Sequence, residues 1–158
     1  KKAMRHAGLY INGGGSLIQD VTSRRSLWFY LHNIQAAHKA GCKVQMYGCG
    51  IGPVLREQHR KLAASVLNAS VDVITLREPD SLKELQSMGV TKPEILLTAD
   101  PALTLPAASE DEIDSVLLRA GIPTHGKYLC FALRNWKGFE DKAPLFAQAA
   151  KYATRPTV

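Results

Sequence analysis

Short apolar runs alternate along the chain with longer stretches in which apolar residues recur at helical spacing. The short runs predict strands at residues 8–12, 44–47, 71–76, 95–98 and 128–133. The longer stretches predict helices over residues 26–39, 55–68, 78–88, 109–120 and 139–152. Gly41, Gly89 and Gly121 stand where three of these helices should end, because glycine readily takes the left-handed conformation that closes a helix.

This alternation predicts an α/β fold with a doubly wound, mainly parallel, Rossmann-like sheet. In such sheets ligands bind beyond the carboxyl ends of the strands. The loops that should meet at that edge are residues 13–20, 48–53, 77–80, 100–102 and 134–137. We therefore expect the functional residues in these loops.

The composition fits an ordinary globular protein. Hydrophobic residues make up 46% of the 158 residues, which is enough for a core. The length suits one domain, or one domain with part of another. Residues 101–111 and 121–127 contain prolines or glycines and are candidate boundaries. Because the chain begins with Lys1 and stops within a helix-like stretch, we expect it to be a piece of a longer protein.

The formal net charge of +6 favours anionic partners such as phosphates, acidic polymers or an anionic membrane surface. The basic residues are scattered, so nucleic acid is not expected as a partner. The cysteines form no Cys-x-x-Cys pair and the histidines show no metal-ligand spacing, so neither a disulfide framework nor a metal site is predicted. Reduced thiols fit a cytoplasmic protein. No apolar run approaches the length of about 18 residues that suggests a membrane span.

Two glycine-rich segments, residues 13–20 and 48–53, follow predicted strands. Glycines let the backbone turn sharply, and their amides can form a nest for an anion. The candidate binding residues are Gly13, Gly14, Gly15, Ser16, Gly50 and Gly52. Neither segment matches a Walker A loop or the dinucleotide fingerprint. For the first segment the alternative is a tight strand-to-helix turn without a ligand, and the second segment at the same edge of the sheet strengthens the case for a ligand cleft.

Arg77 and Arg134 each follow a predicted buried strand. A guanidinium in such a place needs a partner or a ligand, and its planar fork suits a carboxylate or a phosphate. For Arg77 the alternative is an internal ion pair with Glu78, Asp80 or Asp100. For Arg134 the alternative is a stacked surface arginine, since Trp136 lies beside it.

Asp20 and Asp100 are the candidate catalytic residues, because both fall in loops at the expected ligand edge. Either carboxylate could act as an acid or a base, or could orient a hydroxyl. Capping of a helix is the alternative for both.

Four motifs resemble those of the polysaccharide pyruvyl transferases in order and spacing. They are Gly-Gly-Gly-Ser-Leu-Ile-Gln-Asp-Val-Thr-Ser (13–23), Tyr-Gly-Cys-Gly-Ile-Gly-Pro (47–53), Thr-Leu-Arg-Glu-Pro-Asp-Ser (75–81) and Thr-Ala-Asp-Pro-Ala (98–102). Within that family the chain is most similar to the CsaB type of bacterial cell-wall assembly. The resemblance runs from about Gly8 to Trp136.

The resemblance implies a GT-B-like enzyme of two Rossmann-like domains. Residues 1–122 would form the N-terminal domain without its first βα unit, and residues 123–158 would begin the second domain. Many relatives have proline at the position of Asn135. The family's essential histidine and lysine are expected in the missing part, so the chain alone should be inactive.

The implied activity is transfer of a pyruvyl group from phosphoenolpyruvate to two sugar hydroxyls, which gives a cyclic ketal. A general acid protonates the methylene carbon, one hydroxyl attacks, phosphate leaves and the second hydroxyl closes the ketal, with a base assisting each hydroxyl. Phosphoenolpyruvate is a co-substrate, and no cofactor is implied. Arg77 and Arg134 would bind this donor, because arginines and glycine-loop amides suit its phosphate and carboxylate.

In the CsaB type the acceptor is a lipid-linked saccharide that contains N-acetylmannosamine, and the ketal helps S-layer proteins to dock on the wall. The resemblance therefore implies a cytoplasmic enzyme that can associate with the inner face of the cell membrane. Two other functions fit the same residues: a GT-B glycosyltransferase that uses a nucleotide sugar, and a non-catalytic anion-binding module.

Overall fold

The computed structural model describes residues 3–126, 129–135 and 138–153. Its contacts divide the chain into two units, Lys1–Pro106 and Ala107–Val158. This division falls in the first of the two candidate boundary stretches. The assignment of residues 1–122 and 123–158 to two domains stays a prediction.

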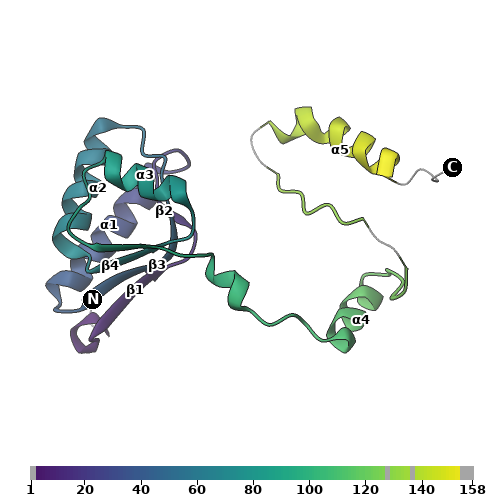
Figure 1. Ribbon diagram of the computed structural model, residues 1–158, viewed down its shortest axis with the longest axis horizontal. Helices are drawn as coiled ribbons and strands as arrows, with labels where there is room; N and C mark the ends of the chain where they lie inside the picture. Colours follow the sequence, from purple (N-terminus) through teal and green to yellow (C-terminus); the bar gives the residue numbers. More distant parts are fainter. Residues whose placement is uncertain (1–2, 127–128, 136–137, 154–158) are drawn as a thin grey trace. The chain divides into compact units, whose positions relative to one another are not determined.

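The first unit is built on a parallel sheet (Figure 1). Its elements in chain order are η1 (Ala3–His6), β1 (Leu9–Gly13), β2 (Ser16–Ile18), α1 (Arg24–Lys39), β3 (Lys43–Ile51), α2 (Glu57–Ser70), β4 (Val73–Leu76), α3 (Pro79–Ser87), β5 (Glu94–Leu97) and η2 (Pro101–Thr104). The strand order is β1-β3-β4-β5, with β2 paired to β3, and every pair is parallel. The predicted α/β class and mainly parallel, Rossmann-like sheet are therefore confirmed.

Helices α1, α2 and α3 lie on the same side of the strands (Figure 1). In a parallel sheet whose strands follow chain order, right-handed crossovers place all the connecting helices on one face. The buried apolar residues form one cluster that runs from Ile18 to Val90. On β1, Leu9 and Ile11 alternate with the more buried Tyr10 and Asn12 and are about half exposed, at 50% and 55%.

Local sequence signals explain where α1 begins and ends. The Ser23 hydroxyl accepts a hydrogen bond from the Ser26 amide at 3.2 Å, which satisfies a donor in the first turn. Gly41 follows the last turn with a φ of +89°, the left-handed conformation that ends many helices. Between these ends, Leu27, Leu31 and Ile34 are buried at helical spacing and hold the helix on the sheet.

The second glycine-rich segment is largely a strand, where the sequence predicted a loop. β3 continues beyond the predicted end at residue 47 to Ile51, and β2 pairs alongside it, with Ser16 opposite Gly50. The register between β3 and β4 shifts at this point. Gly48 has a φ of +57° and its amide donates to Thr75 Oγ1 at 2.8 Å. This irregularity lets the strand bend and then resume its pairing, which apolar periodicity does not reveal.

The second unit contains α4 (Glu110–Arg119) and α5 (Phe139–Ala153). The predicted N-terminus of α4 is confirmed, because the Ser109 hydroxyl and the Glu112 carboxylate form a reciprocal capping box. The strand predicted at residues 128–133 is wrong over residues 129–133, which are irregular, and Tyr128 lies outside the described residues. The described part of this unit contains no other strand with which these residues could form a ladder.

Candidate functional site

Three glycine amides of the two glycine-rich segments are used to join β2 and β1 to β3. They donate as follows: Gly14 to Tyr47 O at 3.0 Å, Gly50 to Gly15 O at 3.0 Å, and Gly52 to Ile18 O at 2.7 Å. These amides are therefore not free donors for a ligand. Within the described part of the chain, the Gly15 amide has no acceptor at hydrogen-bonding distance.

Polar side chains from separate elements meet above the Cα atom of Gly50. A Cβ atom at this position would lie 2.6 Å from Glu78 Oε1, 2.7 Å from Ser16 Oγ and 3.4 Å from Arg77 Nη2. Glycine is therefore required here, because the Ser16 and Glu78 side chains occupy the space that a Cβ atom would need. Ser16 lies on β2, Gly50 on β3, and Arg77 and Glu78 between β4 and α3. We call these four residues the Gly50 recess.

Arg77 is held between two carboxylates. Its Nη1 donates to Asp100 Oδ2 at 3.0 Å, and its Nε lies 3.4 Å from Glu78 Oε2. The internal ion pair that the sequence left open is therefore formed with Glu78 and Asp100, whereas Asp80 pairs with Lys83 at 2.9 Å. Of the three guanidinium nitrogens, Nη2 is the one that remains directed at the Gly50 recess.

The Glu78 carboxylate is fixed by a buried serine. Glu78 Oε1 accepts a hydrogen bond from Ser81 Oγ at 2.9 Å, and Ser81 Oγ in turn accepts from the Ile51 amide at 2.7 Å. Ser81 is fully buried at 0% exposure. The sequence analysis assigned Glu78 no function beyond an ion pair. The signal that could have identified it is a carboxylate directly after Arg77, three residues before a serine that faces the core.

Asp20 binds the start of α2. Its Oδ1 accepts from the Leu55 amide at 2.8 Å, and its Oδ2 accepts from the Arg56 amide at 3.2 Å and lies 2.7 Å from His59 Nδ1. The side chain is 1% exposed. Burial raises the pKa of this carboxyl, but the hydrogen bonds from Leu55, His59 and Arg56 outweigh it and leave the pKa below its usual value.

Asp100 binds the start of η2. Its Oδ1 accepts from the Ala102 amide at 3.0 Å, while its Oδ2 holds Arg77. The capping alternative is therefore realised for Asp100. Asp20 instead binds the two amides that precede the first residue of α2, whose N-cap residue, Arg56, has no side-chain cap hydrogen bond. The catalytic roles of both carboxylates stay predictions.

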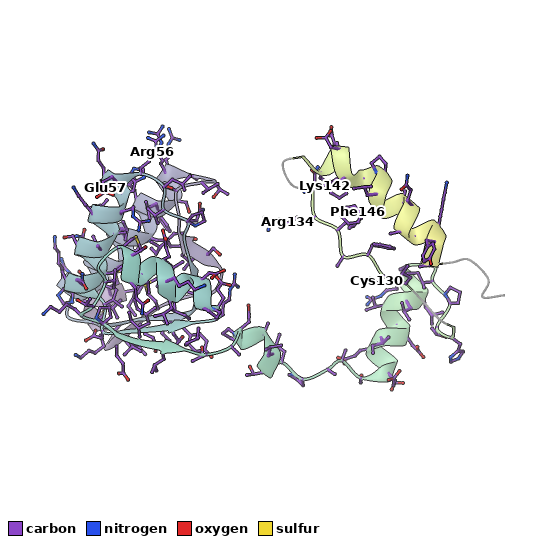
Figure 2. All side chains as sticks on the ribbon, turned by 45° about the horizontal axis from the view of Figure 1, so that its top comes forward. Arg56, Glu57, Cys130, Arg134, Lys142 and Phe146 are labelled. Carbon is purple, nitrogen blue, oxygen red and sulfur yellow. The ribbon has the colours of Figure 1, made fainter. Side chains whose placement is uncertain are left out.

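Arg134 belongs to the second unit, in the irregular segment of residues 129–135, and its side chain is exposed. Figure 2 labels it with Cys130 of the same segment and with Lys142 and Phe146 of α5. Its donor-binding role stays a prediction. Trp136, on which the stacking alternative depends, lies outside the described residues.

Two buried polar groups lie next to the glycine-rich segments. Asn12 directly precedes the first segment and is 5% exposed, and its Nδ2 has no hydrogen-bond partner in the described structure. Cys49 is fully buried, and its burial raises the pKa of the thiol to about 11. Among residues 3–126, 129–135 and 138–153, no group of three or more His, Cys, Asp or Glu side chains could hold a metal ion.

Comparison with protein families gives a match to polysaccharide pyruvyl transferase over residues 1–154. Comparisons with curated proteins and with solved structures gave no match. The matched range contains all four motifs, the Gly50 recess, the whole first unit and residues 107–154 of the second unit. Because the match extends over nearly the whole length, the chain belongs to the polysaccharide pyruvyl transferase family.

Proposed function

We propose that the protein transfers a pyruvyl group from phosphoenolpyruvate to a lipid-linked saccharide precursor of the cell wall. The observation that carries this proposal is the family match over residues 1–154, which indicates pyruvyl transfer to a polysaccharide. The Gly50 recess supports it, because it brings an arginine and a hydroxyl to the edge of the sheet where ligands bind in this fold.

Phosphoenolpyruvate offers a phosphate and a carboxylate, and Arg77 is the candidate group for one of them. Its Nη2 faces the Gly50 recess together with the Ser16 hydroxyl, and both can donate to an anionic oxygen. The two carboxylates beside Arg77 oppose the binding of an anion. The donor must therefore share the guanidinium with Asp100 and Glu78, or displace one of them.

The proposed acceptor and location follow from the resemblance to the CsaB type. The acceptor would be a lipid-linked saccharide with N-acetylmannosamine, and the ketal carboxylate would serve the docking of S-layer proteins. The net charge of +6 favours association with an anionic surface such as the inner face of the cell membrane. Within the described residues, no helix has the length and apolar character needed to cross a bilayer.

The test is release of phosphate from phosphoenolpyruvate with and without a lipid-linked N-acetylmannosamine disaccharide. It uses the full-length protein in which this chain is expected to lie. Arg77→Ala should reduce acceptor-dependent release by about 100-fold or more, because it removes the cation of the donor site. Arg60→Ala is the matched control. The side chain of Arg60 is exposed to a similar extent, 23% against 27% for Arg77, but it pairs with Glu84, which is not one of the four residues of the recess.

Acceptor-dependent release that collapses in Arg77→Ala and persists in Arg60→Ala would support the activity and the role of Arg77. Release that both variants retain would keep the activity and remove Arg77 from the donor site. Turnover of a nucleotide sugar in place of phosphoenolpyruvate would show a glycosyltransferase. Saturable binding of phosphoenolpyruvate by the full-length protein, with no turnover of any donor, would show a binding module.

A further inference from the structure

Glu78 differs from Asp20 and Asp100 in what its carboxylate binds. Asp20 and Asp100 both accept hydrogen bonds from backbone amides at the start of a helix. Glu78 stands at the N-cap position of α3 but makes no side-chain cap hydrogen bond. Its Oε1 instead accepts from Ser81 and lies over the Cα atom of Gly50, 2.6 Å from the point that a Cβ would occupy. In the described structure, Glu78 is therefore the one of these three carboxylates that is not bound by a backbone amide.

Solvent and ligands can reach this carboxylate. The Glu78 side chain is 42% exposed, and the residue also lines an open pocket of about 390 Å³ beside Gly52 and Pro53. Its oxygens keep spare capacity, because a carboxylate can accept about four hydrogen bonds and few are made here. A further donor from a substrate can therefore bind to it without breaking the bond from Ser81.

The Gly50 recess presents both donors and an acceptor. Arg77 Nη2 can only donate, Ser16 Oγ can donate or accept, and Glu78 Oε1 can only accept while ionised. A phosphate or carboxylate oxygen suits Arg77 but is repelled by Glu78. A sugar hydroxyl suits Glu78, because it carries a proton to donate. The recess thus favours an anion on the arginine side and a hydroxyl on the glutamate side.

We propose that Glu78 accepts the proton of the attacking acceptor hydroxyl. This inference rests on the proposed function, in which Arg77 holds phosphoenolpyruvate beside it. The hydroxyl oxygen forms a bond to C2 of the donor while its proton passes to Glu78 Oε1, and the methylene carbon gains a proton from a general acid to become a methyl group. The bond between C2 and the oxygen that bridges to phosphorus then breaks, and phosphate leaves with that oxygen and the electron pair.

The second hydroxyl closes the ketal and loses its own proton. Two hydroxyl protons are thus released, of which one balances the proton gained by the methyl group and the other leaves with the phosphate. Glu78 returns to its ionised form when it passes its proton on. No oxidant, reductant or further reactant is needed.

The test compares Glu78→Gln with wild type in two measurements. Glutamine keeps an acceptor oxygen for Ser81 and replaces the other oxygen, which faces Arg77, by an amide NH2 group, so the charge and the basicity are lost. In the full-length protein we expect kcat for acceptor-dependent phosphate release to fall about 100-fold or more. In the 158-residue chain we expect the Kd for phosphoenolpyruvate, measured by calorimetry, to tighten by about three- to tenfold, because a negative charge beside Arg77 is gone. Glu78→Asp should retain part of the rate.

Glu57→Gln is the control, because it makes the same chemical change at the exposed start of α2 (Figure 2). Among the described residues, the 70% exposed side chain of Glu57 forms an ion pair with Lys61 alone. It should leave kcat and Kd unchanged. A lower kcat with tighter donor binding in Glu78→Gln supports the proposal. Retained kcat overturns it. So does a lower kcat with weaker donor binding, which would show that Glu78 merely positions Arg77.

The same variants separate this inference from the proposed function. If the wild-type protein uses a nucleotide sugar and not phosphoenolpyruvate, the proposed function fails. In that case the rate of Glu78→Gln with the nucleotide sugar tests the role of Glu78 as a proton acceptor. An unchanged rate overturns that role. If the wild-type protein turns over neither donor, both proposals fail.

Discussion

The Asp20 carboxylate joins the first glycine-rich segment to the start of α2. Two backbone amides and the His59 ring converge on its oxygens, although the residues involved are far apart in sequence. The side chain is 1% exposed, so these partners replace water almost completely. The stability of this connection should therefore depend on the ionisation of one carboxyl group.

We predict that Asp20→Asn lowers the free energy of unfolding at pH 7 by about 1–2 kcal/mol, as expected for loss of a helix-start acceptor. The pKa of Asp20 is lowered in the folded state, so its contribution is present above the unfolded pKa of about 3.9. It disappears as the pH falls through the lower folded pKa. Denaturant unfolding at pH 7 and at pH 3 measures this difference.

Asp80→Asn is the control for this experiment. Asp80 also stands in the first turn of a helix, but its side chain is 89% exposed and pairs only with Lys83. Its replacement should leave the free energy of unfolding nearly unchanged at either pH, because an exposed ion pair contributes little to stability. An equal loss of stability in both variants would contradict the special role of Asp20.

The cysteines should differ in reactivity because they differ in burial. Cys130 is exposed, whereas Cys42 and Cys49 are buried. The pKa of Cys49 is raised to about 11, so its reactive thiolate is scarce near neutral pH. We predict that iodoacetamide at pH 8 modifies Cys130 in the folded protein and spares Cys49. Peptide mass spectrometry gives the sites, and modification of all three at similar rates would contradict the buried positions.

The sequence named Arg77 and its possible ion-pair partners, but it could not show how the residues around Gly50 come together. Arg77 was singled out because it follows a buried strand, and Glu78 and Asp100 were named as possible ion-pair partners. Nothing in the spacing shows that Ser16 and Glu78 meet above Gly50, because this depends on how β2 lies against β3. The partnership of Asp20 with His59 joins residues 39 positions apart and is likewise a product of tertiary structure.

Strand β3 and its neighbours show why glycine is required at particular points. Gly14 and Gly48 both have positive φ angles, of 75° and 57°. A Cβ at Gly14 would meet nothing within 4 Å, whereas a Cβ at Gly48 would lie 2.3 Å and 2.5 Å from Pro101 Cγ and Cδ. The two positions therefore share backbone strain but differ in the space available.

We predict that Gly48→Ala destabilises the protein by about 2–4 kcal/mol, because backbone strain and a clash with Pro101 add up. Gly14→Ala should cost only the backbone strain, about 1–2 kcal/mol. Urea denaturation of both variants measures the difference. Equal losses would show that Pro101 moves aside at no cost, and that the fit between β3 and η2 contributes nothing.

The success of element prediction depended on whether a segment relies on local or distant partners. Helices α1 and α4 were predicted closely, because their caps and apolar periods are local. The extension of β3 through residues 48–51 was missed, since it depends on pairing with β2. The strand predicted over residues 129–133 had the right composition, but the described part of its unit offers it no neighbouring strand.

The distribution of buried residues separates the two units. Every residue of the hydrophobic core lies between Ile18 and Val90, within the first unit. In the second unit, α4 and α5 contain no buried residue, and apolar side chains such as Leu118 and Leu145 are more than 60% exposed. The first unit should therefore carry the cooperative stability of the chain, since burial of apolar surface is the main source of that stability.

We predict that a chain ending at Pro106 unfolds in denaturant with the same midpoint as the 158-residue chain. Removal of residues 107–158 takes away no buried apolar side chain among those described, so little free energy of folding is lost. The slope of the transition should also stay similar, because it follows the surface that unfolding exposes. Far-UV circular dichroism during urea titration of both chains measures the two quantities. A midpoint lower by about 1 M urea in the shorter chain would show that the second unit stabilises the first, and the Gly50 recess would then have to be studied only in the longer chain.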